Sequence, residues 1–163
     1  MLETTLPSTI NILSGDQVAM AGALLISALL GSFLGIERAV AGKQAGMRTY
    51  ALVSMGSCLF VLLSTWASQT LAPIFPGVNP LQIAGSVVIG IGFIGSGLLA
   101  SRAGEMHVEL TTASGVWVVA AIGMACGFGF YLLAIVATVL AASILTLFLR
   151  LENSVRKKYH TGQ

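Results

Sequence analysis

The amino-acid sequence predicts an all-α membrane protein, a bundle of five transmembrane helices, on three observations. The composition is too apolar for a soluble domain, because 56% of the 163 residues are hydrophobic and only 9% are charged, against about 25% in soluble proteins. The apolar residues form five runs, each long enough to cross a hydrocarbon core of roughly 30 Å. The eight lysine and arginine residues fall on one side of a five-span arrangement. Residues 1–163 are therefore expected to form a single membrane domain.

The first three spans are predicted over residues 18–36, 49–67 and 81–100. Residues 14–17 (Ser-Gly-Asp-Gln) have the form of a capping box before the first span. Residues 79–82 (Asn-Pro-Leu-Gln) place an N-cap and a proline at the first helical position of the third. All four prolines lie outside the apolar runs, where they interrupt no helix. Because no basic residue precedes the first span, we expect a retained helix rather than a cleaved signal peptide.

The last two spans are predicted over residues 110–126 and 130–149. No charged residue lies between Glu109 and Arg150, and this stretch is too long for a single span. The sequence Gly-Phe-Gly at residues 127–129 divides the stretch, because paired glycines favour a tight turn.

Lysine and arginine determine the predicted orientation. They occur only in the segments that follow the first, third and fifth spans, so all of them lie on one side of the membrane. The positive-inside rule assigns that side to the cytoplasm, which puts the N-terminus outside and the C-terminus inside. Four or six spans would place basic residues on both sides, so the same pattern supports the count of five. The basic residues are Arg38, Lys43 and Arg48, then Arg102, then Arg150, Arg156, Lys157 and Lys158.

Polar side chains gather at the predicted cytoplasmic mouth of the bundle, in the two inner loops and the helix ends beside them. Glu37 closes a long apolar run, and we expect it to pair with Arg48 or Arg102 across the bundle. Three acids of this mouth are also a candidate site for Mg²⁺, which prefers oxygen ligands. The alternative is that these charges only set topology and meet lipid headgroups. The cluster comprises Glu37, Arg38, Lys43, Arg48, Thr49, Arg102, Glu105, Glu109, Thr111 and Thr112, and its magnesium candidates are Glu37, Glu105 and Glu109.

The third span is rich in small residues, which let helix backbones approach closely. At about 100° per residue, Gly85, Gly92 and Gly95 fall on one side, whereas Gly90 and Gly97 fall nearly opposite. We therefore expect this helix to be central in the bundle and packed on two faces, or to line a narrow pore. Its GxGxxG pattern does not predict a dinucleotide site, because no strand precedes it. The candidate packing or pore-lining residues are Gln82, Gly85, Ser86, Gly90, Gly92, Gly95 and Gly97.

GxxxG patterns occur at residues 31–35 and 123–127. They permit helix pairing or a homo-oligomer, for which we favour a dimer. Cys58 and Cys126 lie in apolar runs and are expected to be small buried hydrophobes without a disulfide. The sequence contains no P-loop, zinc-ligand spacing or nucleophile–base motif. We therefore expect neither an enzyme nor a cofactor, and no nucleic-acid partner.

Several segments resemble the MgtC/SapB family, in the family's order and with its spacing. They begin with a Glu-Arg pair at the first inner loop and continue through the glycine-rich third span to the entry of the fourth. The resemblance covers about residues 20–150, and Glu109 departs from it, because glycine is expected before Leu-Thr-Thr. The segments are residues 37–38, 42–49 and 52–53, then 82–83 and 90–97, then 110–113 followed by Trp117.

The resemblance implies a multi-pass protein of the bacterial inner (plasma) membrane, associated with growth under magnesium limitation and, in pathogens, with virulence. It implies a regulator that binds a membrane-protein partner, notably the proton-translocating ATP synthase. Many members continue into a soluble cytoplasmic domain, whereas this sequence ends at Gln163. A short member of the family is therefore expected, with the lipid bilayer and a membrane protein as its partners.

Ion transport is the alternative function, by a small oligomeric channel or carrier for Mg²⁺ or another small ion. The predicted spans contain no Asp or Glu, which argues against an ion relay within the membrane. A pore of backbone carbonyls and of the hydroxyls of Ser54, Ser86, Ser96 and Thr112 stays open as an alternative. A third hypothesis makes the inner acids a sensor of cytoplasmic Mg²⁺ that biases the helix bundle.

Overall fold

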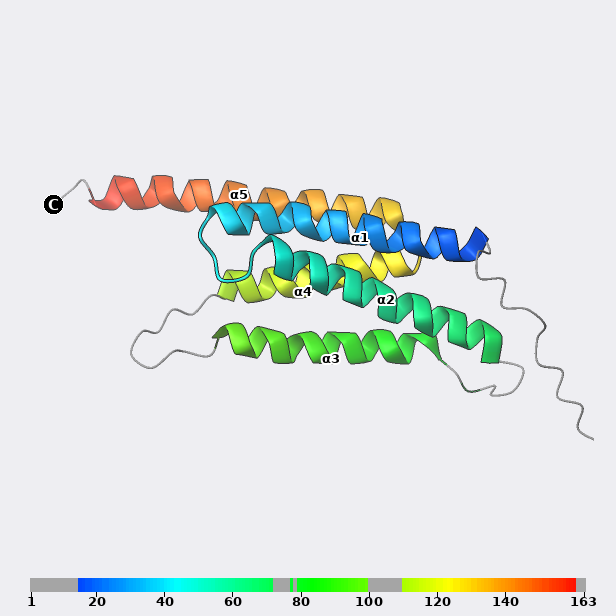
Figure 1. Cartoon of the computed structure of the whole chain (residues 1–163). Coiled ribbons are helices and arrows are strands. Elements are labelled where there is room, and N and C mark those ends of the chain that lie inside the picture. The colour runs from blue at the N-terminus through cyan, green and yellow to red at the C-terminus, as the bar shows by residue number, and fades with distance from the viewer. Residues whose placement is uncertain (1–14, 72–76, 78, 100–109, 161–163) are drawn as a thin grey trace, which may run out of the picture.

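The described part of the chain folds into five helices. The structure is a computed structural model, and it describes residues 15–71, 77, 79–99 and 110–160. Each helix is long and apolar enough to cross a membrane, which confirms the predicted five-span, all-α fold. The helices are α1 (Gly15–Val40), α2 (Met47–Leu71), α3 (Pro80–Leu99), α4 (Leu110–Gly127) and α5 (Tyr131–His160), and Figure 1 shows them side by side.

Helix α5 is longer than the span predicted from hydropathy, which ends at residue 149. Its 30 residues correspond to about 45 Å at 1.5 Å per residue, more than the roughly 30 Å of the hydrocarbon core. In Figure 1 its C-terminal part extends beyond the other four helices. The apolar run ends where the charged residues begin. The helix continues beyond it because leucine, glutamate, arginine and lysine are good helix formers.

Helices α2 and α4 form the centre of the bundle. Helix α2 packs against α1, α3 and α4, and α4 packs against α1, α2, α3 and α5. Helices α3 and α5 are peripheral, because α3 contacts only α2 and α4 among the helices, and α5 only α1 and α4. The fully buried side chains follow this division and come mainly from the two central helices: Tyr50, Cys58, Val61, Val116, Val119, Ile122 and Cys126.

Glycines allow the central helices to approach closely. A Cβ atom at Gly31 would lie 2.6 Å from the carbonyl oxygen of Tyr50, and one at Gly123 would collide with the carbonyl oxygen of Ser54. A Cβ atom at Gly127 would also meet a backbone carbonyl of α2, at 2.8 Å. The two GxxxG patterns therefore serve helix pairing inside the chain, α1 against α2 and α4 against α2.

The prediction that the third span is central is wrong for the single chain. Helix α3 turns Ile91, which is 7% exposed, toward the bundle. A Cβ atom added at any of its five glycines would meet nothing within 4 Å. Helical periodicity places small residues on two sides of this helix, but it does not say whether either side meets the same chain. These glycines are Gly85, Gly90, Gly92, Gly95 and Gly97.

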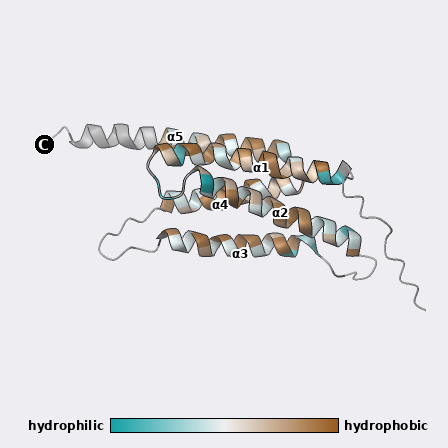
Figure 2. Ribbon diagram, viewed as in Figure 1, coloured by the Kyte–Doolittle hydropathy of each residue, from teal (hydrophilic) through white to brown (hydrophobic). Residues whose placement is uncertain are grey.

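The basic residues of the described part mark one end of the bundle. Here α1, α3 and α5 end and α2 and α4 begin, with Arg38, Lys43 and Arg48 in and around the loop between α1 and α2. We call this the basic end. Figure 2 shows hydrophobic residues along the helices and hydrophilic ones where α2 begins. The cytoplasmic placement of the basic end stays a prediction from the positive-inside rule.

Candidate functional site

The loop of residues 41–46 makes a tight turn at the basic end. The Ala41 N–H donates to the carbonyl oxygen of Glu37 (2.9 Å), and the Lys43 N–H donates to that of Arg38 (3.0 Å). Gly42 has a φ of 68°, a left-handed conformation that glycine adopts without strain. These bonds cap the end of α1 and return the chain directly to the start of α2, so the polar side chains of this loop lie close to the bundle.

Glu37 and Arg38 form a bidentate ion pair. The Nε atom of Arg38 donates to Oε2 of Glu37 at 2.5 Å, and Nη2 donates to Oε1 at 2.8 Å. The Arg38 side chain is 2% exposed and that of Glu37 is 19% exposed. Such a pair keeps both charges in a poorly solvated place, because each neutralises the other.

Among the described residues, the partner of Glu37 is therefore Arg38 rather than Arg48. Arg48 is exposed on the surface of α2, and Arg102 lies outside the described residues. The neighbouring Arg38 takes the carboxylate instead, because its side chain is the one that turns inward at the end of α1.

Tyr50 is a site residue that the sequence reasoning missed. Its side chain is fully buried, and its hydroxyl donates to the carbonyl oxygen of Thr112 at 3.3 Å, which joins α2 to the start of α4. Gly115 makes room for it, since a Cβ atom there would collide with the Tyr50 hydroxyl. A tyrosine among the polar residues that open α2 was the available signal, because buried tyrosines need a hydrogen-bond partner.

The predicted polar cluster is brought together only in part. Arg38 and Thr112 are buried, whereas Arg48 and Thr111 are exposed. The remaining described members are half-buried at the same end. These are Glu37, Lys43 and Thr49, while Arg102, Glu105 and Glu109 lie outside the described residues.

The candidate magnesium site is represented in the structure by Glu37 alone. Both of its carboxylate oxygens accept hydrogen bonds from Arg38, so a cation would have to compete with the guanidinium for them. Glu105 and Glu109 lie outside the described residues. Within the described ranges, no group of three His, Cys, Asp or Glu side chains is arranged to hold a metal ion.

The four hydroxyls suggested as pore-lining do not share one path in the described chain. Ser54 is buried between helices, with its Oγ 3.1 Å from that of Ser27. Ser86 and Ser96 are exposed on α3 and donate to carbonyls of their own helix, at 3.1 and 2.7 Å. Thr112 is buried beneath Tyr50. Cys58 and Cys126 are free and buried in the core, as predicted.

A family model described as the MgtC family matches residues 24–154. The chain belongs to the MgtC family. The resemblance seen over about residues 20–150 is thereby confirmed, and with its five spanning helices the chain is a bacterial membrane protein.

Relatives within the MgtC family include proteins from three bacteria. YhiD of Escherichia coli K12, provisionally named a magnesium transporter, is 40% identical over 139 residues, covering 84% of this chain and 64% of that protein. Protein MgtC of Salmonella typhimurium LT2 is 41% identical over 124 residues, covering 75% and 50%. Protein SrpB of Synechococcus elongatus is 36% identical over 147 residues, covering 85% and 80%. The chain thus spans half to two thirds of the first two relatives, and no solved structure matches it.

Proposed function

We propose that this member of the MgtC family is a regulatory protein of the bacterial inner membrane that acts by binding another membrane protein during adaptation to low magnesium. The observation that carries the proposal is an uncovered small-residue face on α3. Gly85 and Gly92 lie on this face with Ser96, and a Cβ atom at either glycine would meet nothing within 4 Å. We call these three residues the outer face. Such a surface leaves the backbone open to close approach by a helix of another protein.

The proposed partner is the proton-translocating ATP synthase, on the basis of the family resemblance. The arrangement of the described residues also favours binding over conduction. Glu37 is engaged by Arg38, and most of the buried hydroxyls in the described spans, such as those of Ser54 and Thr138, are satisfied by neighbouring protein groups. A regulator of this kind needs no continuous polar path through its own helices.

Replacement of Gly92 by leucine is expected to weaken binding to the ATP synthase at least tenfold, because the larger side chain separates the two helices. The measurement is energy transfer between the labelled chain and labelled ATP synthase in liposomes, titrated at fixed lipid content. Gly22→Leu is the matched control, since Gly22 is a helical glycine on α1 that also has open space around it. Equal binding by both variants would contradict the role of the outer face.

A small channel or carrier for Mg²⁺ is the second candidate function, supported by the provisional name of the Escherichia coli relative. We expect purified protein in proteoliposomes to give no Mg²⁺ uptake above that of empty liposomes. The measurement is fluorescence of an enclosed magnesium indicator after external Mg²⁺ is added. Saturable uptake that Glu37→Gln abolishes would overturn the regulatory proposal and make Glu37 part of a cation path.

A further inference from the structure

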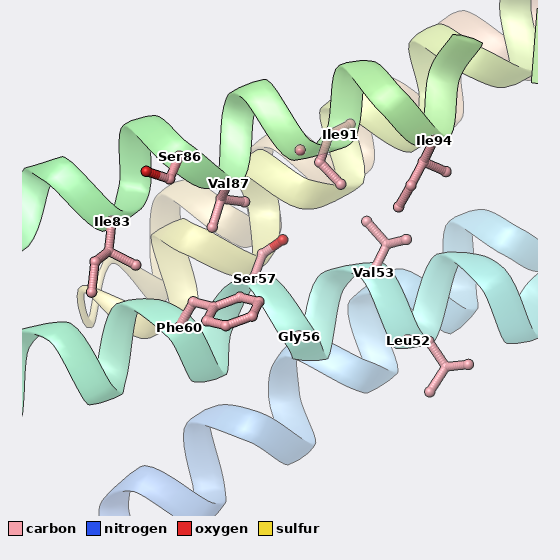
Figure 3. A pocket seen from close by; sticks show the side chains of 11 residues that line it. Leu52, Val53, Gly56, Ser57, Phe60, Ile83, Ser86, Val87, Ile91 and Ile94 are labelled. Carbon is pink, nitrogen blue, oxygen red and sulfur yellow. The ribbon is translucent and has the colours of Figure 1, made fainter. Parts of the chain in front are cut away.

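A groove of about 580 Å³ lies between α2 and α3, within the membrane-spanning part of both helices. Gly56 of α2 and Gly90 of α3 belong to its walls, and a Cβ atom at either would meet nothing within 4 Å. Figure 3 shows Phe60 and Ile83 toward one end and Ile94 toward the other. The groove is open because glycines stand where larger side chains would close it.

The hydroxyl of Ser57 indicates what kind of molecule fills the groove. Ser57 is 2% exposed, and Figure 3 shows its oxygen directed into the space between α2 and α3. It makes no hydrogen bond to the described residues, whereas the buried hydroxyls of Ser27 and Ser54 bond to each other. A lipid acyl chain brings no hydrogen-bonding group to this hydroxyl. A protein helix brings carbonyls and side-chain hydroxyls, so it is the better occupant.

The chain itself carries a surface that complements the groove. Ile89 is 79% exposed and Phe93 is 82% exposed. Both side chains project from α3 beside the groove wall that contains Ser86 and Gly90. A two-fold axis that runs parallel to α3, between the two copies, would therefore place the Ile89–Phe93 ridge of each copy against the groove of the other. In such an isologous contact the same patch serves both subunits.

The exposed side chains of this patch offer an area comparable with one side of a standard interface, and within a bilayer their close packing is what would hold two copies together. An aromatic side chain buries roughly 150–250 Å², and a standard interface takes about 800 Å² from each partner. Two phenylalanines and four aliphatic side chains of the observed exposure supply an area of that order. They are Leu52 (63% exposed), Phe60 (56%), Ile83 (39%), Ile89 (79%), Phe93 (82%) and Ile94 (40%).

We propose that the groove between α2 and α3 is the contact surface of a parallel homodimer, in which the ridge of Ile89 and Phe93 enters the groove of the second copy. The GxxxG patterns of α1 and α4 are not available for this contact, because α2 already covers Gly31 and Gly123 within the chain. The groove lies on the side of α3 that carries Gly90, nearly opposite Gly85 and Gly92, and the ridge of Ile89 and Phe93 lies between the groove and the outer face.

Substitution of Gly90 by leucine tests the proposal, because the added side chain fills the groove of both copies. We expect the wild type to dimerise in liposomes, measured by energy transfer between differently labelled copies at varied protein-to-lipid ratio. Gly90→Leu is expected to weaken the dimer at least tenfold. A monomeric wild type, or a Gly90→Leu variant that dimerises as tightly as the wild type, would overturn the proposal.

A matched control separates this contact from folding. Gly22→Leu also enlarges a helical glycine in open space, and it lies on α1, away from the groove, so it is expected to dimerise like the wild type. Both leucine variants should keep the wild-type helix content by circular dichroism. Loss of the dimer in Gly22→Leu together with Gly90→Leu would count against the groove. Energy transfer between copies of the chain and energy transfer to the ATP synthase are separate measurements, so dimerisation and partner binding can each fail while the other stands.

Oxidative crosslinking in native membranes gives an independent readout. Gly90→Cys is expected to yield a species of twice the chain mass, whereas Leu29→Cys, on an α1 position that is 69% exposed, is expected to yield none. The wild-type protein gives the background level of crosslinking, which should be low because its two cysteines, Cys58 and Cys126, are fully buried. A Gly90→Cys product of any other mass would mean that a different membrane protein occupies the groove, and would overturn the homodimer.

Discussion

Gly123→Ala is expected to lower the free energy of unfolding of the helix bundle by about 3 kcal/mol, at the upper end of the range for overpacked cores. The new methyl group would collide with the carbonyl oxygen of Ser54. That oxygen belongs to the backbone of α2, so no side chain can rotate away, and α2 and α4 must separate to accept the methyl. Separation would also disturb the neighbouring contacts of Gly115 and Gly127 with the same helix.

The effect of Gly123→Ala can be measured from the midpoint of unfolding in mixed micelles titrated with sodium dodecyl sulfate. Gly92→Ala is the matched control, because a Cβ atom there meets nothing within 4 Å. Alanine has the higher helix propensity, by about 1 kcal/mol, so the control is expected to be as stable as the wild type or slightly more so. A Gly123→Ala midpoint equal to that of Gly92→Ala would show that α2 and α4 are not in backbone contact.

Arg38→Gln is expected to destabilise the bundle by about 3 kcal/mol, because it leaves the Glu37 carboxylate without its counter-charge in a poorly solvated place. The pair is held by two hydrogen bonds, and the arginine is 2% exposed. Arg48→Gln removes the same charge from an exposed position ten residues along the chain. It is expected to leave the unfolding midpoint within error of the wild type, since exposed charges contribute little.

A double variant separates the ion pair from the general loss of a long side chain. When Glu37→Gln is added to Arg38→Gln, no unpaired charge remains, and part of the lost stability should return. The same micelle titration measures it. A double variant less stable than Arg38→Gln alone would contradict the assignment of Glu37 and Arg38 as mutual partners.

The five-helix fold was predictable from the sequence, because the length and hydropathy of each apolar run are enough to identify a membrane-spanning helix. Five apolar runs gave five helices, and the Gly-Phe-Gly turn at residues 127–129 separated the last two. The place of α3 was not predictable, because its glycines fall on faces that suit an inner helix or an outer one equally well. Only contacts between helices distinguish the two, and α3 touches α2 and α4 alone among the helices.

The candidate site was predicted less completely than the fold. Charge position identified the basic end and its residues Glu37 and Arg38, but not that adjacent residues would pair, since neighbours on a helix point in different directions. Tyr50 could be suspected from its place among the polar residues that open α2, but its partner could not be predicted, because the hydroxyl bonds to a backbone carbonyl. Glu105 and Glu109 lie outside the described residues, so their place in a magnesium site stays a prediction.

The central contact between α2 and α4 has a consequence for the order of assembly during synthesis. Spans enter the bilayer in chain order and then pack, and α3 precedes α4. Helices α1 and α2 can therefore pack together as soon as the second span is inserted. The side of α2 that contacts Gly123 stays uncovered until the fourth span is inserted. Until then Tyr50 lacks the Thr112 carbonyl that accepts its hydroxyl. The central contact of the bundle can therefore form only after the fourth span has been inserted.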